Sequence, residues 1–128
     1  MSQVGNVQVK IKRVYDPPAV EDGQRVLIDR LWPRGLKRED ARLDEWLRDI
    51  APSDDLRRWF GHDPARWEAF QARYRRELAD AERQAALEKL RERVRRGPLT
   101  LLFAAKDAEH CNAQVLRSLL EEEQAGAG

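Results

Sequence analysis

The residues that could do chemistry gather behind a short apolar run. Residues 26–28 are apolar, and Asp29 and Arg30 follow them directly, with Trp32 and Arg34 close behind. A carboxylate can carry a proton, and a guanidinium can hold a carboxylate or a phosphate through paired hydrogen bonds. We therefore predict a ligand site in which Arg30 and Arg34 bind an anion. Asp29 would move a proton, and Trp32 would either stack on a planar ligand or cover the pocket.

A second apolar run, residues 99–105, also ends at a charged pair, Lys106 and Asp107. Lys106 would add a cation to the predicted anion site. Asp107 would form an acid–base pair with Asp29, or it would cap the helix that follows, which is the interpretation we favour. A structural alternative exists for the cations, because Arg30 and Lys106 could simply pair with the neighbouring aspartates at a buried strand end.

His62 and His110 are the histidines of the sequence, and each falls in a loop or at the start of a helix. Histidine titrates near neutral pH, so either could act as a general acid or base beside Asp29; the alternative is a surface residue without a role. Cys111 could be an activated thiol, but its position on an apolar helical stripe favours a core residue. One cysteine and two histidines leave too few ligands for zinc, and the sequence has no glycine-rich phosphate loop, so we predict neither a metal nor a cofactor.

A sheet is needed to bring these residues together. Residues 7–13 alternate apolar and polar side chains, as a strand near a sheet edge does. The two apolar runs have the composition of strands buried on both faces. Apolar residues at three- and four-residue spacing predict helices between and after the runs. These helices are expected over residues 39–50, 54–60, 64–78 and 87–94, and after Asp107.

This order of elements predicts an α/β fold with a short, mostly parallel sheet of three or four strands and helices on both faces. Residues 7–122 would form a single domain, with a flexible leader over residues 1–6 and a flexible tail over residues 123–128. In such sheets ligands bind beyond the carboxyl ends of the strands. The charged pairs after the two apolar runs would therefore converge if their strands are parallel neighbours.

The composition limits the classes of partner. Charged residues make up 37% of the chain, hydrophobic residues 41%, and the net charge is +1. A net charge near zero gives no overall field that would attract nucleic acid or an anionic membrane. The single cysteine suits a reducing compartment, and no apolar stretch has the length of a signal peptide or a membrane span. We expect a cytoplasmic protein without a membrane partner.

Several stretches of the sequence resemble the YeaO-like family of small bacterial proteins. The string Asp-Arg-Leu-Trp-Pro-Arg-Gly at residues 29–35 is the most specific, and it is joined by residues 12–16, 43–46, 51–53 and 98–102. The resemblance covers nearly the whole chain and implies a cytoplasmic bacterial protein with a single α/β domain. It implies no reaction and no catalytic residues, because the family is one of unknown function.

Two hypotheses about function follow from these residues. The first is a small enzyme or ligand-binding domain for a small anionic molecule that carries a phosphate or a carboxylate, with nucleotide-like ligands among the candidates. The alternative is a non-catalytic interaction module that contacts nucleic acid through its arginine-bearing loop, which the near-zero net charge does not favour. Binding to nucleic acid would weaken steeply with salt, which separates the two hypotheses.

Overall fold

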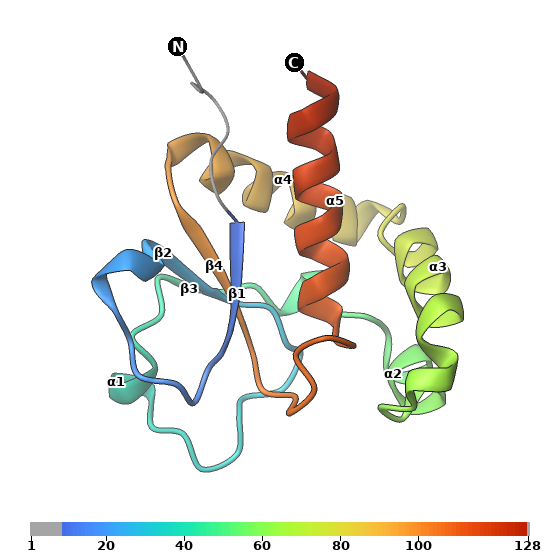
Figure 1. The fold of residues 1–128 in the computed structure, drawn as a ribbon, viewed down its shortest axis with the longest axis horizontal. Helices are drawn as coiled ribbons and strands as arrows, with labels where there is room; N and C mark the ends of the chain where they lie inside the picture. The colour runs from blue at the N-terminus through green and yellow to red at the C-terminus, as the bar shows by residue number, and fades with distance from the viewer. Residues whose placement is uncertain (1–8, 128) are drawn as a thin grey trace.

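The computed structural model describes residues 9–127, which contain a four-stranded sheet. The strands lie in the order β1-β4-β2-β3, and every neighbouring pair is parallel (Figure 1). The predicted α/β fold is confirmed, with the first strand at an edge and the two apolar strands in the middle. The predicted leader and residues 7 and 8 of the predicted first strand lie outside the described residues. The strands are β1 (Val9–Arg13), β2 (Gln24–Leu27), β3 (Glu45–Trp46) and β4 (Leu99–Phe103).

The two central strands end side by side. Val26 of β2 lies opposite Leu101 of β4, and Leu27 lies opposite Leu102. The pairing continues past the end of β2, because the amide of Ile28 donates to the carbonyl of Leu102 at 3.1 Å. The segments that begin at residues 29 and 104 therefore leave the sheet at the same edge, which is where ligands bind in open parallel sheets.

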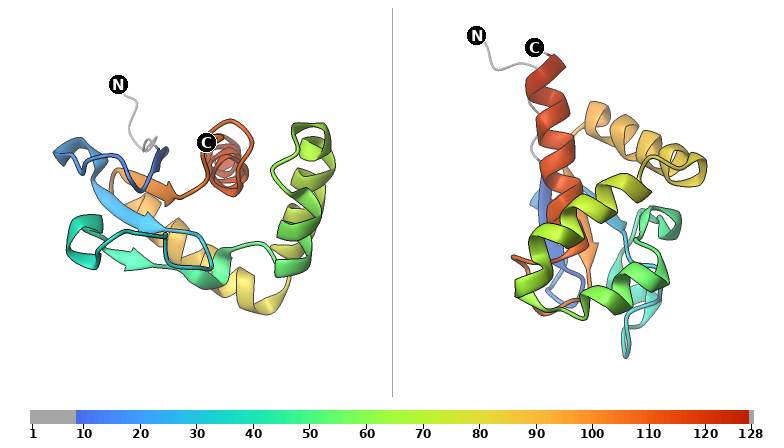
Figure 2. Two further views of the ribbon diagram at one scale, coloured as in Figure 1. Left: turned by 90° about the horizontal axis from the view of Figure 1, so that it is seen from below. Right: turned by 90° about the vertical axis from the view of Figure 1, so that its right-hand side faces the viewer.

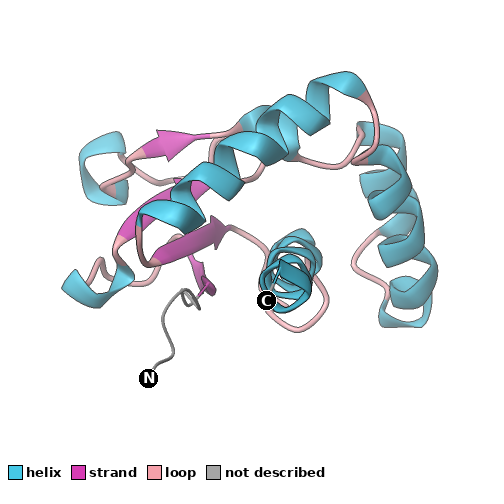
Figure 3. Cartoon of the chain, turned by 90° about the horizontal axis from the view of Figure 1, so that it is seen from above, coloured by secondary structure: helices cyan, strands magenta, loops and turns pink. Residues whose placement is uncertain are grey.

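Helices cover both faces of the sheet, as predicted, but unequally. Leu101 and Phe103 contribute to a large core with side chains of the long helices, whereas Leu27 and Leu102 contribute to a small core under the segment 32–46. Figures 2 and 3 show α4 and α5 on one side of the sheet and α1 on the other. The helices are α1 (Arg38–Ala41), α2 (Asp54–Phe60), α3 (Trp67–Glu77), α4 (Ala81–Arg96) and α5 (Asn112–Ala127), with 3-10 turns η1 (Val20–Asp22), η2 (Arg48–Ile50) and η3 (Pro64–Arg66).

The predicted helix over residues 39–50 is wrong. The segment instead forms α1, the edge strand β3 and η2. Its apolar residues have helical spacing, but they are divided between the two cores: Leu43 and Trp46 pack in the small core, and Leu47 and Ile50 in the large one. A strand at the sheet edge can serve both faces, and the amide of Leu47 donates to the carbonyl of Leu27 at 2.8 Å.

The α2–α3 pair forms an arm that is fixed at its base. The hydroxyl of Ser53 caps α2 by accepting from the amide of Leu56 at 3.1 Å. Glu77 at the end of α3 accepts from the amide and the hydroxyl of Ser53, and the hydroxyl of Tyr74 donates to the carbonyl of Ile50. The arm is thereby anchored next to the carboxyl edge of the sheet (Figure 1).

Helix α5 runs along the sheet and reaches the end of the described residues. It continues through residues 123–127, for which the sequence predicts a flexible tail; that flexibility stays a prediction. Glu123 on this helix pairs with Arg91 of α4 at 2.7 Å. None of the described helices is long and apolar enough to cross a membrane.

Candidate functional site

A cleft of about 700 Å³ opens at the carboxyl edge of the sheet. Its lining comes from the loops that follow β2 and β4, from the arm formed by α2 and α3, and from the start of α5. Its volume lies within the usual range for sites that bind small molecules. Every candidate site residue lines this cleft: Asp29, Arg30, Trp32, Arg34, His62, Lys106, Asp107 and His110.

Asp29 is held in place by the elements around it. Its carboxylate accepts from the amide of Ala104 at 2.9 Å and from the side-chain amide of Asn112 at 3.2 Å, and its carbonyl accepts from the indole of Trp46 at 2.7 Å. Burial raises the pKa of Asp29, and its hydrogen bonds from Ala104 and Asn112 only partly oppose that effect. The carboxylate therefore joins β2, β4 and α5 where they meet.

Three of the cations that line the cleft have no side-chain partner among the described residues, whereas a fourth, Arg57, pairs with Asp54. In the described part of the chain, the side chains of Arg30, Arg34 and Lys106 form neither a hydrogen bond nor an ion pair. The structural alternative, in which Arg30 and Lys106 pair with the neighbouring aspartates, is not what the structure shows. Asp29 is bonded to Ala104 and Asn112, and Asp107 is bonded to a histidine.

Trp32 is fixed on the side of the cleft. Its indole lies edge-on to Trp46 with 5.3 Å between ring centroids, and its ring nitrogen donates to the carbonyl of Leu36 at 2.7 Å. The guanidinium of Arg38 lies 4.6 Å from the ring centroid. The side chain packs against the small core while lining the cleft, and its contact with a ligand stays a prediction.

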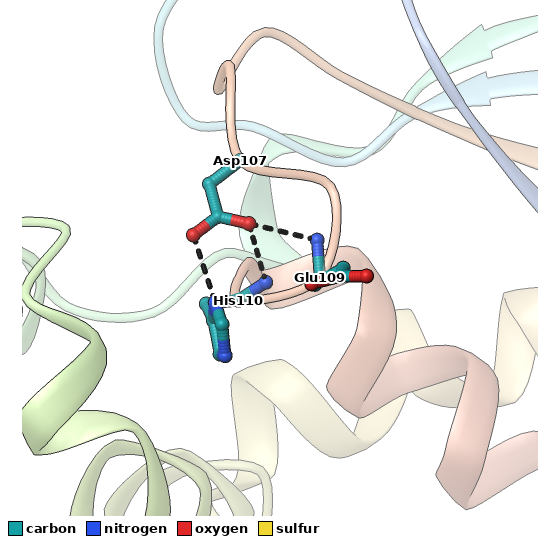
Figure 4. Close-up of side chains that lie close together, drawn as sticks. All are labelled: Asp107, Glu109 and His110. Atoms are coloured by element: carbon teal, nitrogen blue, oxygen red, sulfur yellow. Dashed lines mark hydrogen bonds and ion pairs between the residues drawn. The ribbon is translucent and has the colours of Figure 1, made fainter.

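Asp107 and His110 form a hydrogen-bonded pair beside the cleft (Figure 4). The Nδ1 atom of His110 lies 2.8 Å from one carboxylate oxygen of Asp107, and the other oxygen accepts from the backbone amides of Glu109 and His110. The hydrogen bond from His110 is the main reason that the pKa of Asp107 is lowered. With Nδ1 as the donor, Nε2 of a neutral His110 is left as an acceptor.

Asp107 does not cap α5 directly, because the helix begins at Asn112. Its carboxylate instead closes the turn that precedes the helix. The rings of His110 and Trp67 of α3 pack in a T-shaped arrangement, with 5.3 Å between centroids. The imidazole is thus held from two sides, by the turn and by the arm.

His62 reaches the same cleft from the end of α2. It is exposed, it has a left-handed backbone with φ of 58°, and its ring centroid lies 6.2 Å from that of Phe60. Together with Arg57, its charge acts to lower the pKa of Asp29, against the larger effect of burial. The structure thus brings both histidines to one cleft although they are far apart in sequence.

Cys111 is a core residue, as favoured from its helical spacing. It is 3% exposed, and its Sγ atom donates to the carbonyl of Ala108 at 3.6 Å. Burial raises the pKa of the thiol, which disfavours the thiolate that a nucleophile needs.

One group in the described residues has the ligand atoms for a metal ion. Asp107, Glu109 and His110 each offer one atom within 4.8 Å of the others. The carboxylate of Asp107 and the imidazole of His110 already satisfy each other at 2.8 Å, so the pair is complete without an ion.

Sequence reasoning missed several residues of the cleft. Asn112 holds Asp29, and Arg57 acts on its charge, but neither stands in a pattern that indicates a site. Tyr15 follows β1, and its hydroxyl donates to the carbonyl of Arg34 at 2.9 Å, which fixes the loop that carries the cations. The available signal for Tyr15 was its position after the first strand, at the same edge as the two charged pairs.

Comparison with known proteins identifies relatives over nearly the full length. The uncharacterised protein YeaO of Escherichia coli is 41% identical over 114 residues, which cover 89% of this chain and 97% of that protein. The uncharacterised proteins Rv3073c of Mycobacterium tuberculosis and Mb3100c of Mycobacterium bovis are each 41% identical over 117 residues, which cover 91% of this chain and 97% of theirs. No solved structure matches the chain.

A family model, DUF488-N3i, matches residues 8–127 and is described as the inactive DUF488-N3 subclade. The resemblance to YeaO-like proteins is therefore confirmed by a named relative and by a family match over most of the chain. The chain belongs to the DUF488-N3i family.

Proposed function

We propose that this protein binds a small anionic molecule, bearing a phosphate or a carboxylate, in the cleft at the carboxyl ends of β2 and β4. The observation that carries the proposal is that Arg30, Arg34 and Lys106 line one cleft and have no partners among the described side chains. Unpaired cations in a concave site favour an anion, and two guanidiniums add hydrogen-bonding geometry suited to carboxylate or phosphate.

The acids of the cleft do not cancel this preference. Asp29 is occupied by Ala104 and Asn112, and Asp107 by His110 and two backbone amides. Their charges are thus partly compensated within the fold, whereas the charges of the three cations are not. A bound anion would supply the missing compensation.

Binding without turnover is favoured over catalysis. The family model that matches the chain is described as an inactive subclade. The potential nucleophile Cys111 is buried with a raised pKa. Both observations argue against catalysis, but neither argues against binding. A protein that binds a ligand without converting it would therefore agree with both the cleft and the family description.

A catalytic role is the second candidate because of the Asp107–His110 pair. A carboxylate that fixes Nδ1 of an imidazole leaves Nε2 free to accept a proton, which is the arrangement of a general base. The candidate is tested by incubating the protein with any ligand that binds and following product formation. Turnover that disappears in His110→Ala would establish catalysis, and intact ligand after prolonged incubation would exclude it for that ligand.

A thermal-shift screen tests the proposed binding. The panel is inorganic phosphate, ribose 5-phosphate, nucleoside monophosphates and di- and tricarboxylates. A ligand at 100 times its dissociation constant stabilises a protein by about 2.7 kcal/mol, which is easily seen as a rise in Tm. We expect the rise to be lost in Arg34→Ala and kept in Arg58→Ala, which removes the same charge from an exposed position outside the cleft. Equal shifts in both variants would contradict the proposal.

A further inference from the structure

The lining of the cleft is not uniform. The cations Arg30, Arg34 and Lys106 come from the loops that follow β2 and β4, whereas the arm contributes rings, among them Phe60, Phe70 and His62. His110, from the turn before α5, adds a further ring to the lining. The cleft thus has three unpaired cations on the loops after β2 and β4, which also carry Trp32. It also has an aromatic part, formed by His110 and by the rings on the arm, which also carries the paired cation Arg57.

The aromatic part is a connected and rigid set of rings. Phe60 and Phe70 stack with 4.4 Å between centroids and an interplanar angle of 22°. Both are buried, so they form the base of this part, and the more accessible rings are those of His62 and His110. Trp67 and Asp107 fix the plane of the His110 ring from two sides. A ring held in this way is a stacking platform that loses little entropy when a planar ligand binds.

An acceptor group also lines the cleft. The carboxylate of Asp29 lines the cleft, and each of its oxygens has one protein donor, Ala104 for one and Asn112 for the other. A carboxylate oxygen has room for more than one donor. A ligand group that fits here therefore carries N–H or amino donors, since an acceptor would face the carboxylate without a partner.

The volume of the cleft is also larger than an anion alone would need. About 700 Å³ lies in the range of sites that hold molecules of drug or nucleotide size. An inorganic phosphate at the cations would leave the aromatic part and Asp29 without a ligand contact.

We infer that the anion bound by this cleft is attached to a flat nitrogen-containing ring with N–H or amino donors, as in a nucleoside monophosphate. The anionic end would lie at Arg30, Arg34 and Lys106, and the ring would lie against His62 and His110 with its donors toward Asp29. This inference rests on the proposed function, and it adds the chemical class of the ligand.

Calorimetric titration of the unmodified protein tests the inference without any variant. The probes are adenosine and guanosine 5′-monophosphates, the matched ring-free compound ribose 5-phosphate, and inorganic phosphate. Stacking on protein rings contributes about 1–3 kcal/mol per base, so we expect at least one nucleotide to bind at least about tenfold more tightly than ribose 5-phosphate. Equal affinity of the nucleotides and ribose 5-phosphate would overturn the inference while leaving anion binding intact.

Two variants separate the ends of the ligand. Asp29→Asn and His62→Asn should each weaken the nucleotide severalfold relative to ribose 5-phosphate, whose affinity should not fall; asparagine tolerates the left-handed backbone at position 62. Arg34→Ala should weaken both probes by a similar factor. If none of the probes binds, the proposed function fails together with the inference. If nucleotide binding responds to Arg34→Ala but to neither asparagine variant, the placement of the ring is wrong.

Discussion

At the scale of single residues, the two aspartates of the cleft have pKa values shifted in opposite directions by their surroundings. Asp107 is hydrogen-bonded to His110 and to two backbone amides, and its pKa is lowered. Asp29 lies deeper, and burial raises its pKa despite two hydrogen bonds. Asp107 is therefore suited to remain ionised and orient an imidazole, while Asp29 is held as a carboxylate at some cost to stability.

The raised pKa of Asp29 predicts a pH-dependent effect of Asp29→Asn. The folded protein holds the proton of Asp29 to higher pH than the unfolded chain, whose value is near 3.8. Wild-type stability should therefore fall as pH rises from the unfolded value through the raised folded value. Asparagine has no charge to desolvate, so the variant should gain stability relative to wild type above that window and lose this advantage below pH 3.8.

Urea unfolding of both proteins between pH 3 and pH 8 measures this difference. In the variant the amide of Ala104 can still donate to the asparagine side-chain oxygen. The bond to Asn112 needs a flip of the Asn112 amide, which gives up its contacts with the carbonyl of Ile28 and the amide of Ala113, so this loss offsets part of the gain. A variant that is less stable than wild type at neutral pH, with the same difference at acid pH, would show that the charge of Asp29 is well compensated in the folded state.

At the scale of elements, a buried ion-pair network joins β1, η1 and β2. Asp22 is 4% exposed, and its carboxylate accepts from Lys12 at 3.1 Å, from the amide of Ala19 at 3.0 Å and from Arg25. Burial alone would raise the pKa of Asp22, but these three donors outweigh it and lower the pKa. The stabilisation from this group is present above the unfolded pKa and is lost as pH falls through the lower folded value.

Asp22→Asn should destabilise the fold by about 3–5 kcal/mol, because it leaves the buried Arg25 without its counter-charge. The measurement is the free energy of unfolding by urea at pH 7. Asp54→Asn is the matched control: Asp54 pairs with Arg57 at 3.2 Å on the surface, with about half of each side chain exposed, and should change stability by less than about 1 kcal/mol. Similar losses in the two variants would refute a structural role for the network.

The turn between η1 and β2 needs glycine at position 23. Gly23 has φ of 65°, and a Cβ atom there would lie 2.6 Å from the carbonyl oxygen of Pro98. Gly23→Ala should lower the free energy of unfolding by roughly 1–3 kcal/mol because alanine is strained in this left-handed backbone. The clash with Pro98 should lower it further. Gly35 has a similar φ of 77°, but a Cβ atom added there would have no atom within 4 Å. Gly35→Ala therefore measures the backbone strain without a clash. The melting temperatures of the two variants provide the comparison, and an equal decrease would argue against the clash.

The sequence predicted correctly those elements whose residues all lie in the same kind of environment. The runs at residues 26–28 and 99–103 are apolar except for Thr100 because the central strands are buried on both faces. Residues 43–50 mislead because Trp46 and Leu47 serve different cores, and over so short a segment that division has the spacing of a helix. Helix ends such as Ser53 were predictable because capping is a local interaction.

Some features of the candidate site could likewise be predicted from the sequence, and others could not. The charged pairs after two parallel strands predicted where Asp29 and Lys106 would meet, since that follows from topology. The partner of Asp29, Asn112, depends on how α5 returns past the sheet, and no local pattern carries that information. The sequence also could not decide whether Arg30 and Lys106 are unpaired, because ion pairs with Asp29 or Asp107 were equally compatible with it.

At the scale of the whole molecule, the fold separates the unpaired cations of the cleft from the elements that stabilise it. The large core lies between the sheet and the long helices, and the Asp22 network lies at the other end of the strands, near the start of β2 and β4. The unpaired charge of the cleft lies beyond the carboxyl ends, on loops, whereas Phe60 and Phe70 at its base belong to the large core. Substitution of an exposed cation in these loops should therefore alter binding with little effect on the fold.

Titration of isotope-labelled protein with inorganic phosphate, followed by the backbone amide signals in NMR spectra at constant ionic strength, tests the central claim most directly. We predict saturable shifts concentrated in residues 29–36 and 104–110, reduced in Arg34→Ala and unchanged in Arg58→Ala. Shifts centred on the arginine-rich helix α4, or shifts of the same size in Arg34→Ala as in wild type, would contradict an anion site at the carboxyl ends of β2 and β4.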